Sequence, residues 1–229
     1  MRLDRFICKH TPHSHQTSRR LVASGHVRVN GQVQTDPRYP VDGFSTVHLH
    51  QQLLQQQQAH YLMLHKPAGY LSATCDPDHP TVLELLPEGL RLELHIAGRL
   101  DRATTGLLLL TNDGLWSRRI TAPEKKIPKI YRVTTAEPIS PEAETRFTAG
   151  IWLAREGVTT SPAQLERLDL HTCRLTIYEG RHHQVKRMFA AVGNEVTALH
   201  RESMGVIQLD SGLAPGEFRA LTTDEYQSV

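Results

Sequence analysis

The clearest hydrophobic pattern in this chain is a run of four leucines, Leu107–Leu110. A short run of consecutive apolar residues is typical of a strand that is buried on both faces, and too few apolar residues follow it for a core helix. The next residues, Thr111–Gly114, favour a turn that ends in a glycine able to take a positive φ. The pattern therefore predicts an interior strand that ends in a turn.

The N-terminal region combines two short helical patterns with a strand pattern. Apolar residues recur at helical spacing within 3–7, and a second helix is expected from an N-cap at Ser14 to a C-terminal Gly25. Residues 26–29 alternate like a strand, and the Asn-Gly pair at 30–31 favours a tight hairpin. These elements predict a small α/β unit.

A polar segment without charges, QQLLQQQQ at 51–58, separates this unit from the rest of the chain. Its composition is typical of a linker, and a short helical extension is the alternative. We therefore place a domain boundary here, with a first domain at 1–58 and a second at 59–229.

The second region shows several further patterns of apolar residues. Short apolar or alternating runs predict strands, and spacings of three and four predict helices. The segment 134–170 has little periodicity, so we expect only strands and loops there. The expected strands are 61–64, 130–133 and 175–178, the expected helices are 116–122 and 185–192 (ended by Gly193), and 75–87 is expected to be a loop with a helix start.

Length and composition favour an ordinary globular protein with one good core and a small satellite domain. The chain has 229 residues, of which 39% are hydrophobic. No apolar run approaches the roughly 20 residues of a membrane span, and the charged start MRLDRFICKH is unlike a signal peptide. The three cysteines are far apart and form no CxxC pair, which favours reduced thiols in a cytosolic protein.

Positive charge is concentrated at the N-terminal end. Residues 1–50 contain seven Lys and Arg against three Asp, a balance of +4, whereas the remainder has 19 against 21, a balance of −2. This asymmetry favours a phosphate-binding module at the start of the chain.

A carboxylate lies just before the leucine run, in the sequence GRLDRATTG. Asp101 follows Arg99 by two residues, and a loop entering a buried strand would hold it rigidly beside apolar walls. Two interpretations stay open on the residues alone. Asp101 either caps a turn onto the amides of Thr104 and Thr105, or is a catalytic group.

The motifs around Asp101 resemble those of the RsuA-type pseudouridine synthases, which isomerise uridine in ribosomal RNA. GRLD, TTG, the apolar strand and TNDG follow in the family's order, as do HKPAGY before them and KIYRV, EGRHHQVKRMF and APGEFRALT after them. The two N-terminal helices and the VRVNG hairpin resemble an S4 RNA-binding domain. The resemblance implies an α+β protein in which an S4-like domain precedes a domain with a largely antiparallel mixed sheet and a central cleft.

The resemblance also implies the roles of individual residues. It makes Asp101 the catalytic carboxylate, Tyr131 the ring that lies against the target base, and Arg181 the partner that pairs with Asp101. Substrate-binding candidates are Arg99, Lys66, Pro67, Thr104, Thr105, His183, Gln184 and Lys186, and RNA-binding candidates of the S4-like domain are Arg5, Lys9, Arg19, Arg20 and Arg28.

No cofactor, nucleotide or metal is expected, because the reaction oxidises nothing and donates no group. Asp76, Asp78 and His79 share a Pro-interrupted loop that is a weak metal site, and the adjacent His182 and His183 point in different directions on a helix.

The expected substrate is 16S ribosomal RNA of the small subunit, in an assembly intermediate, modified in the cytoplasm by a monomer without membrane contact. The alternatives are a synthase acting on 23S ribosomal RNA and a non-catalytic S4-type RNA-binding protein. A glycosidase-like hydrolase using Asp101 is a third, although the motifs contain no obvious second carboxylate.

Overall fold

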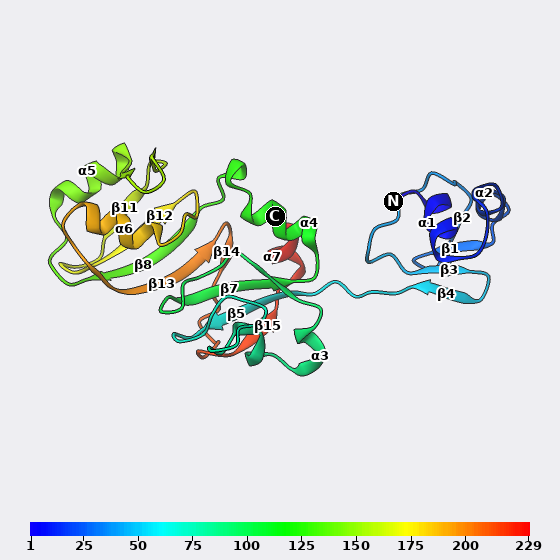
Figure 1. Cartoon of the computed structure of the whole chain (residues 1–229), viewed down its shortest axis with the longest axis horizontal. Coiled ribbons are helices and arrows are strands. Elements are labelled where there is room, and N and C mark those ends of the chain that lie inside the picture. The colour runs from blue at the N-terminus through cyan, green and yellow to red at the C-terminus, as the bar shows by residue number, and fades with distance from the viewer. The chain divides into compact units, whose positions relative to one another are not determined.

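The computed structural model describes all residues from 1 to 229 and divides them into two compact units (Figure 1). The first unit is Met1–Ala59 and the second is His60–Val229. The division falls one residue after the boundary expected from the sequence. No helix in the structure is both long and apolar enough to span a lipid bilayer.

The first unit packs two helices on a small antiparallel sheet. Helix α1 (Leu3–His10) and helix α2 (His15–Ala23) precede a sheet in the order β2-β1-β3-β4. Ser14 caps α2 by accepting a hydrogen bond from the Thr17 amide, as its sequence position predicts. The strands are β1 (Val27–Val29), β2 (Gln32–Gln34), β3 (Val47–Leu49) and β4 (Gln52–Gln55), and the buried core is Leu3, Phe6, Ile7, Val22, Val27, Val29, Val41, Val47 and Leu49.

The hairpin between β1 and β2 confirms the Asn-Gly prediction. Asn30 and Gly31 both have positive φ, 51° and 81°, which is the backbone of a tight turn between twisted strands. The Asn30 side chain also accepts a hydrogen bond from the Thr46 amide, 2.9 Å away, and so ties the turn to the chain that enters β3.

The interpretation of 51–58 as a linker is wrong for its first half. Gln52–Gln55 forms β4, an edge strand that pairs antiparallel with β3. The Gln55 amide nitrogen donates to the carbonyls of Asp42 and Ser45, each 2.8 Å away. Leu54 of the same strand packs against the core of the first unit. Residues 56–60, which follow β4, have no regular structure.

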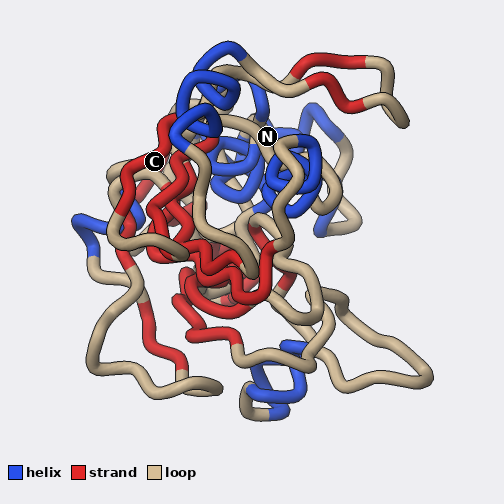
Figure 2. The backbone as a smooth tube through the Cα atoms, turned by 90° about the vertical axis from the view of Figure 1, so that its left-hand side faces the viewer, coloured by secondary structure: helices blue, strands red, loops and turns tan.

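The second unit is built on one nine-stranded sheet, in the order β11-β12-β8-β13-β7-β5-β15 with β14 beside β13 and β6 beside β7 (Figures 1 and 2). Every pairing is antiparallel except that of β7 with β13, so the sheet is mixed and mostly antiparallel as expected. The strands are β5 (Tyr61–Lys66), β6 (His95–Ala97), β7 (Thr105–Thr111), β8 (Lys129–Thr135), β11 (Gln164–Arg167), β12 (Thr172–Ile177), β13 (Val196–Met204), β14 (Ile207–Gln208) and β15 (Phe218–Ala220). A separate two-stranded sheet contains β9 (Trp152–Leu153) and β10 (Val158–Thr159).

The leucine run lies in β7 and is buried on both faces, as predicted. Leu108 and Leu110 belong to the core cluster that includes Phe147 of α5 and Phe189 of α6. Leu107 and Leu109 belong to a second cluster, with Trp116 and Ile120 of α4. All four leucines have no exposed surface. Helices on both faces of the sheet therefore explain why this strand is continuously apolar.

The two helices expected at 116–122 and 185–192 are present, shifted by one or two residues, and further helices occur that the sequence patterns did not predict. The helices are η1 (Val82–Leu85), α3 (Glu88–Arg91), α4 (Gly114–Thr121), η2 (Pro123–Lys125), α5 (Pro141–Ala149), α6 (Gln184–Ala191) and α7 (Thr223–Gln227), of which η1 and η2 are 3₁₀ helices. Gly114 has no positive φ but begins α4, because the Asp113 carboxylate accepts from the amides of Leu115 and Trp116. Helix α5 lies in the segment where only strands and loops were expected; Ser140 caps it and Pro141 is its first residue.

The two parts of the large sheet meet at a short parallel joint between β7 and β13. Only two residue pairs connect these strands, Thr105 with His200 and Gly106 with Arg201. Gly106 has φ of +104°, and a Cβ at this position would lie 2.3 Å from the Arg201 carbonyl oxygen. Only glycine permits both this backbone conformation and this close approach.

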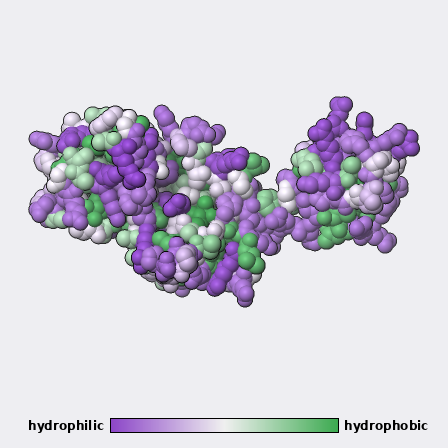
Figure 3. Space-filling model, in the orientation of Figure 1, coloured by the Kyte–Doolittle hydropathy of each residue, from purple (hydrophilic) through white to green (hydrophobic).

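Most of the surface seen in the space-filling view is hydrophilic, with small apolar areas between (Figure 3). Large exposed apolar side chains include Leu92, Leu115, Trp152 and Leu170, which lie on different elements. Scattered apolar residues of this kind are normal on a folded surface.

The joint predicts a large effect for Gly106→Ala. We expect about 1–3 kcal/mol of destabilisation from the strained backbone and a further loss from the overlap with β13. Chemical denaturation of the purified variant measures this loss. Gly89→Ala in α3 is the matched control, because a Cβ there meets no atom within 4 Å. Equal stability of the two variants would contradict the tight joint.

Candidate active site

The loop 98–104, which connects β6 to β7 and carries Asp101, is held by hydrogen bonds along its backbone. The Ser72 hydroxyl donates to the Leu100 carbonyl at 2.7 Å and accepts from the Leu100 amide at 3.1 Å. The Asp101 carbonyl accepts from the Thr104 amide at 3.0 Å and closes a turn. The turn is thus made by the backbone of Asp101, which leaves its carboxylate free for another role.

Lys66, the last residue of β5, holds one side of this loop. Its side chain is fully buried, and its ammonium donates to the carbonyls of Pro67, Arg102 and Thr104 at 3.0, 3.1 and 2.8 Å. Burial lowers the pKa of Lys66 to about 8, while the nearby Asp101 carboxylate acts in the opposite direction. With three donors committed to backbone carbonyls, Lys66 has none for substrate, so its expected role in substrate binding is wrong.

The residues after Lys66 also bind the loop that carries Asp101. The Gly69 amide donates to the Arg102 carbonyl at 2.9 Å, and the Arg102 side chain donates back to the Gly69 carbonyl at 3.1 Å. Pro67 fixes the corner between them but does not line the cavity beside Asp101. The HKPAGY motif therefore supports the loop that carries Asp101.

Arg201 of β13 holds the other side of the loop, a role that the sequence analysis missed. Only 1% of the residue is exposed. Its guanidinium donates to the carbonyls of Gly98 and Leu107 at 2.8 Å each and approaches that of Arg99 at 3.5 Å. The available signal was an arginine in the middle of a strand, where burial of a charge requires partners.

Asp101 lines a small cavity of about 70 Å³ with residues from both parts of the sheet. Its carboxylate is 26% exposed and lies 3.5 Å from the His183 Nε2 atom. The lining residues are Arg99, Leu100, Asp101, Thr104, Tyr131, Ile177, Gly180, Arg181, His183, Gln184, Val185 and Leu199. The expected catalytic residues Asp101, Tyr131 and Arg181 thus share one cavity.

Tyr131 comes to this cavity from β8 and is 7% exposed. In the sheet register it lies directly opposite Arg201 of β13. Directly opposite residues of antiparallel strands place their side chains on the same face. Tyr131 therefore stands on the sheet face that Arg201 also occupies.

The expected pair between Arg181 and Asp101 is not formed in this structure. Arg181 Nε instead donates to the Glu179 carboxylate at 3.1 Å. That carboxylate is fixed nearby, because it also accepts from the Ser161 amide at 2.9 Å and from the Gln184 side chain at 3.0 Å. A preorganised anion two residues away binds the guanidinium more readily than one on another loop.

His183 occupies the position beside Asp101 that was expected for Arg181. Its backbone is left-handed, with φ of 51°, and it precedes the first turn of α6. Its ring stacks on His182, with 3.8 Å between the ring centroids. The unusual backbone turns the ring toward Asp101, which a sequence pattern of adjacent histidines does not reveal.

The remaining expected substrate-binding residues divide between the cavity and other places. Thr104 and Gln184 line the cavity, although the Gln184 amide already contacts Arg181 and Glu179. The Thr104 hydroxyl is buried and has no hydrogen-bond partner. Thr105 points to His200 instead, 2.8 Å away, and neither Thr105 nor Lys186 lines the cavity.

Lys129 is a further buried cation beneath the cavity. It lies two residues before Tyr131, and its ammonium donates to the Ile127 carbonyl at 3.1 Å. Burial lowers its pKa to about 8, Arg201 lowers it further, and Glu179 opposes both. Only 8% of the residue is exposed, so Lys129 is not available to a phosphate at the surface.

The expected RNA-binding residues of the first unit are all exposed. Arg5 and Lys9 lie on α1, Arg19 and Arg20 on α2, and Arg28 on β1. Beside them the buried Asp4 carboxylate accepts two hydrogen bonds from Arg2 and lies 4.0 Å from Arg19 Nε. Burial alone would raise the pKa of Asp4, but the hydrogen bonds from Arg2 and the Arg5 amide keep it below its usual range.

No group of three or more His, Cys, Asp or Glu residues in the chain is arranged to hold a metal ion. In the loop that carries Asp76, Asp78 and His79, the Asp76 carboxylate accepts from the amides of the other two at 3.0 and 2.9 Å. Asp76 is therefore a turn-capping residue.

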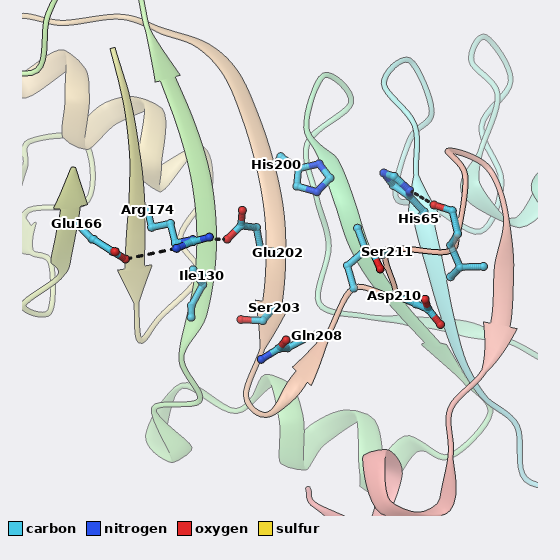
Figure 4. Close-up of a pocket in the computed structure, with 12 residues that line it drawn as sticks. His65, Ile130, Glu166, Arg174, His200, Glu202, Ser203, Gln208, Asp210 and Ser211 are labelled. Atoms are coloured by element: carbon cyan, nitrogen blue, oxygen red, sulfur yellow. Dashed lines mark hydrogen bonds and ion pairs between the residues drawn. The ribbon is translucent and has the colours of Figure 1, made fainter. Parts of the chain in front are cut away.

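A larger groove, of about 600 Å³, lies on the other face of the sheet, and none of the expected site residues line it (Figure 4). Within it the Glu202 carboxylate pairs with Arg174 of β12 at 2.9 Å, and Arg132 of β8 binds the same carboxylate at 2.8 Å. Side chains alternate along a strand, so His200 and Glu202 face away from the cavity that Leu199 lines. The groove and the Asp101 cavity therefore open on opposite faces of the sheet.

Comparison with known proteins agrees with this geometry. Residues 60–191 match the model of the RNA pseudouridylate synthase family, and residues 1–47 match the S4 domain. The chain is 52% identical to the ribosomal small subunit pseudouridine synthase A of Pseudomonas aeruginosa and 46% identical to that of Escherichia coli K12, over 100% of each chain.

A solved structure supports the same assignment. A crystal structure of a pseudouridylate synthase covers 100% of this chain and 99% of its own, with a TM-score of 0.73 and 39% identity. Family match, full-length relatives and solved structure thus agree with one another. The chain belongs to the RNA pseudouridylate synthase family and carries an N-terminal S4 domain.

Proposed function

We propose that this protein isomerises one or more uridines of 16S ribosomal RNA to pseudouridine, with Asp101 as the catalytic carboxylate. The observation that carries the proposal is a cavity lined by both Asp101 and Tyr131. The loop that carries Asp101 is held by two buried cations, Lys66 and Arg201. Full-length identity of 46–52% to synthases named for the ribosomal small subunit supports 16S RNA as the substrate over the alternative, 23S RNA.

The chemistry requires a base to leave its sugar and return by another atom. The bond between C1′ and N1 breaks, the uracil turns, and a new bond joins C5 to C1′. C5 then loses its proton and N1 ends with one, so the atoms balance without any oxidant, reductant or donated group. The protein must supply an ionised carboxylate and a cavity that retains the free uracil.

Asp101 meets the first requirement in our proposal. The buried ammonium of Lys66 lies behind its loop, and His183 lies 3.5 Å in front of it. A carboxylate held in this place can attack the sugar or base, or stabilise positive charge at C1′. Among the residues that line the cavity, Asp101 is the one carboxylate, so the pair needed by a glycosidase is missing.

Tyr131 and the rim of the cavity meet the second requirement. We propose that the ring of Tyr131 lies against the face of the uracil, because β8 holds this side chain in the wall of the cavity. A cavity of about 70 Å³ is smaller than typical small-molecule sites of about 300–1,000 Å³. The exposed Arg181 and His183 therefore have to move when a flipped nucleotide enters.

The S4 domain supplies placement on the RNA in this proposal. Its exposed cations contact phosphates, which gives affinity and register but no chemistry. We infer that the enzyme acts as a monomer on small-subunit RNA during ribosome assembly in the cytoplasm. Arg99, exposed at the rim of the cavity, is placed to fill the space that the flipped base leaves.

Asp101→Asn is expected to abolish isomerisation, because the amide keeps the shape of the side chain but not its charge. Affinity for the RNA should stay within about threefold. Single-turnover mapping of pseudouridine on 16S RNA measures the first effect and a binding titration the second. Asp78→Asn, in an exposed loop away from the cavity, is the control and should keep the parent rate. An Asp101→Asn enzyme that turns over at the parent rate would reject the assignment.

Simultaneous replacement of Arg19 and Arg20 by Ala should weaken binding and leave the rate at saturating RNA intact. Each lost phosphate contact should flatten the plot of log affinity against log salt by about 0.7–0.9. The matched control is Arg118 and Arg119, a second adjacent pair of exposed arginines, in α4 of the other unit. We expect the control to change the slope less. If the two double variants give the same slope, the S4 domain is not the main phosphate contact.

A further inference from the structure

The catalytic residues come from two parts of the sheet whose strands pair with each other only between β7 and β13. Asp101 belongs to the part that contains β5 and β7, since its loop leads directly into β7. Tyr131 and the segment 179–184 belong to the part that contains β8, β12 and β13. The position of Asp101 relative to Tyr131 therefore depends on the joint between β7 and β13.

The pairing between β7 and β13 is short, since it consists of two residue pairs. The register joins His200 with Thr105 and Arg201 with Gly106, and no other pair links the two strands. By comparison, β13 pairs with β8 over seven residue pairs. The backbone pairing at this joint is therefore short, and side-chain contacts across it, such as the packing of Met204 against Leu107 and Leu109, have to set its angle.

Arg201 lies at the centre of this joint. Its Cα is paired with Gly106 on one side and with Tyr131 on the other. Its side chain crosses to the β7 part and donates to the carbonyls of Gly98 and Leu107, with Arg99 at the edge of hydrogen-bond distance. One residue thus contacts the strand of Tyr131, the start of β7 and the start of the Asp101 loop.

The chemistry of the guanidinium fits this position. It is planar and presents its N–H donors as a rigid fork, so several carbonyls are held at fixed angles to each other. It is buried, with 1% of the residue exposed, so water does not compete for these carbonyls. Lys66 holds the far end of the same loop, at Arg102 and Thr104, which makes the loop a segment fixed at both ends.

We propose that Arg201 is a positioning residue of the reaction, which sets the distance and angle between Asp101 and Tyr131 across the joint. It touches neither the substrate nor the cavity, since it is absent from the cavity lining. It acts through the carbonyls of Gly98 and Arg99, three and two residues before Asp101. A shift of about 1 Å at a catalytic group costs on the order of 100-fold in rate.

This inference rests on the catalytic role of Asp101 and is tested with two replacements of Arg201. Arg201→Lys keeps the charge and much of the volume but loses the fork, and Arg201→Met removes the charge and the donors. We expect the single-turnover rate at saturating RNA to fall about 10-fold for Lys and about 100-fold or more for Met. RNA affinity should stay within about threefold, and both variants should show a cooperative thermal transition.

Arg174→Met is the matched control. Arg174 is also a strand arginine with a contact on β13, but it binds the Glu202 carboxylate in the groove on the other face and no backbone carbonyl of the loop. We expect it to keep the parent rate. A control that loses as much rate as Arg201→Met would assign the effect to general weakening of the sheet and would overturn the proposal.

Three further outcomes would also overturn it. The first is a folded Arg201→Lys enzyme with the parent rate, since the fork would then be unnecessary. The second is a loss of RNA affinity with the rate at saturation intact. The third is an Arg201→Lys variant that does not fold, because Arg201 would then belong to the fold alone. Failure of the Asp101 role is seen separately, as turnover by Asp101→Asn.

Discussion

The constraint on which this structure depends is the burial of Lys66 and Arg201 against the carbonyls of a single loop. A buried charge without partners costs several kcal/mol, and hydrogen bonds from charged groups contribute about 1.5–3 kcal/mol each. Five backbone carbonyls at 3.1 Å or less satisfy the two cations, and three of them, those of Gly98, Arg102 and Thr104, belong to this loop. Neither the cations nor the loop can move alone, so the Asp101 backbone is fixed before any substrate binds.

The mixed sheet gives this loop its place relative to the rest of the site. Most of the sheet is antiparallel and extensively paired, but β7 meets β13 through only two residue pairs. The close approach at Gly106 and the guanidinium of Arg201 are concentrated at that joint. Asp101 and Tyr131, which come from separate segments of the chain, line one cavity near this joint. Rigid support of this kind is what a precise catalytic geometry requires.

Positive charge has different uses in the two units. In the first unit, arginines and a lysine are exposed on two helices and a strand, where they are available to phosphates. In the second unit, Lys66, Lys129 and Arg201 are buried and bind carbonyls. The exposed cations of the first unit and the cations that hold the Asp101 loop are thus separate groups, distinguished by burial and not by residue type.

The sequence by itself determined the elements whose signal is local. The apolar run 107–110, the caps at Ser14 and Gly193, and the hairpin at Asn30 followed from spacing and backbone preference, and the motif around Asp101 identified the catalytic loop by resemblance. Only the tertiary structure decided which groups meet. It made Lys66 a support of the loop, gave Arg181 to Glu179, and placed His183 beside Asp101. It also turned part of a glutamine-rich segment into an edge strand and used Arg201 to join two parts of the sheet. These contacts join residues that are distant in the chain or depend on one unusual φ, and local pattern carries no information about either.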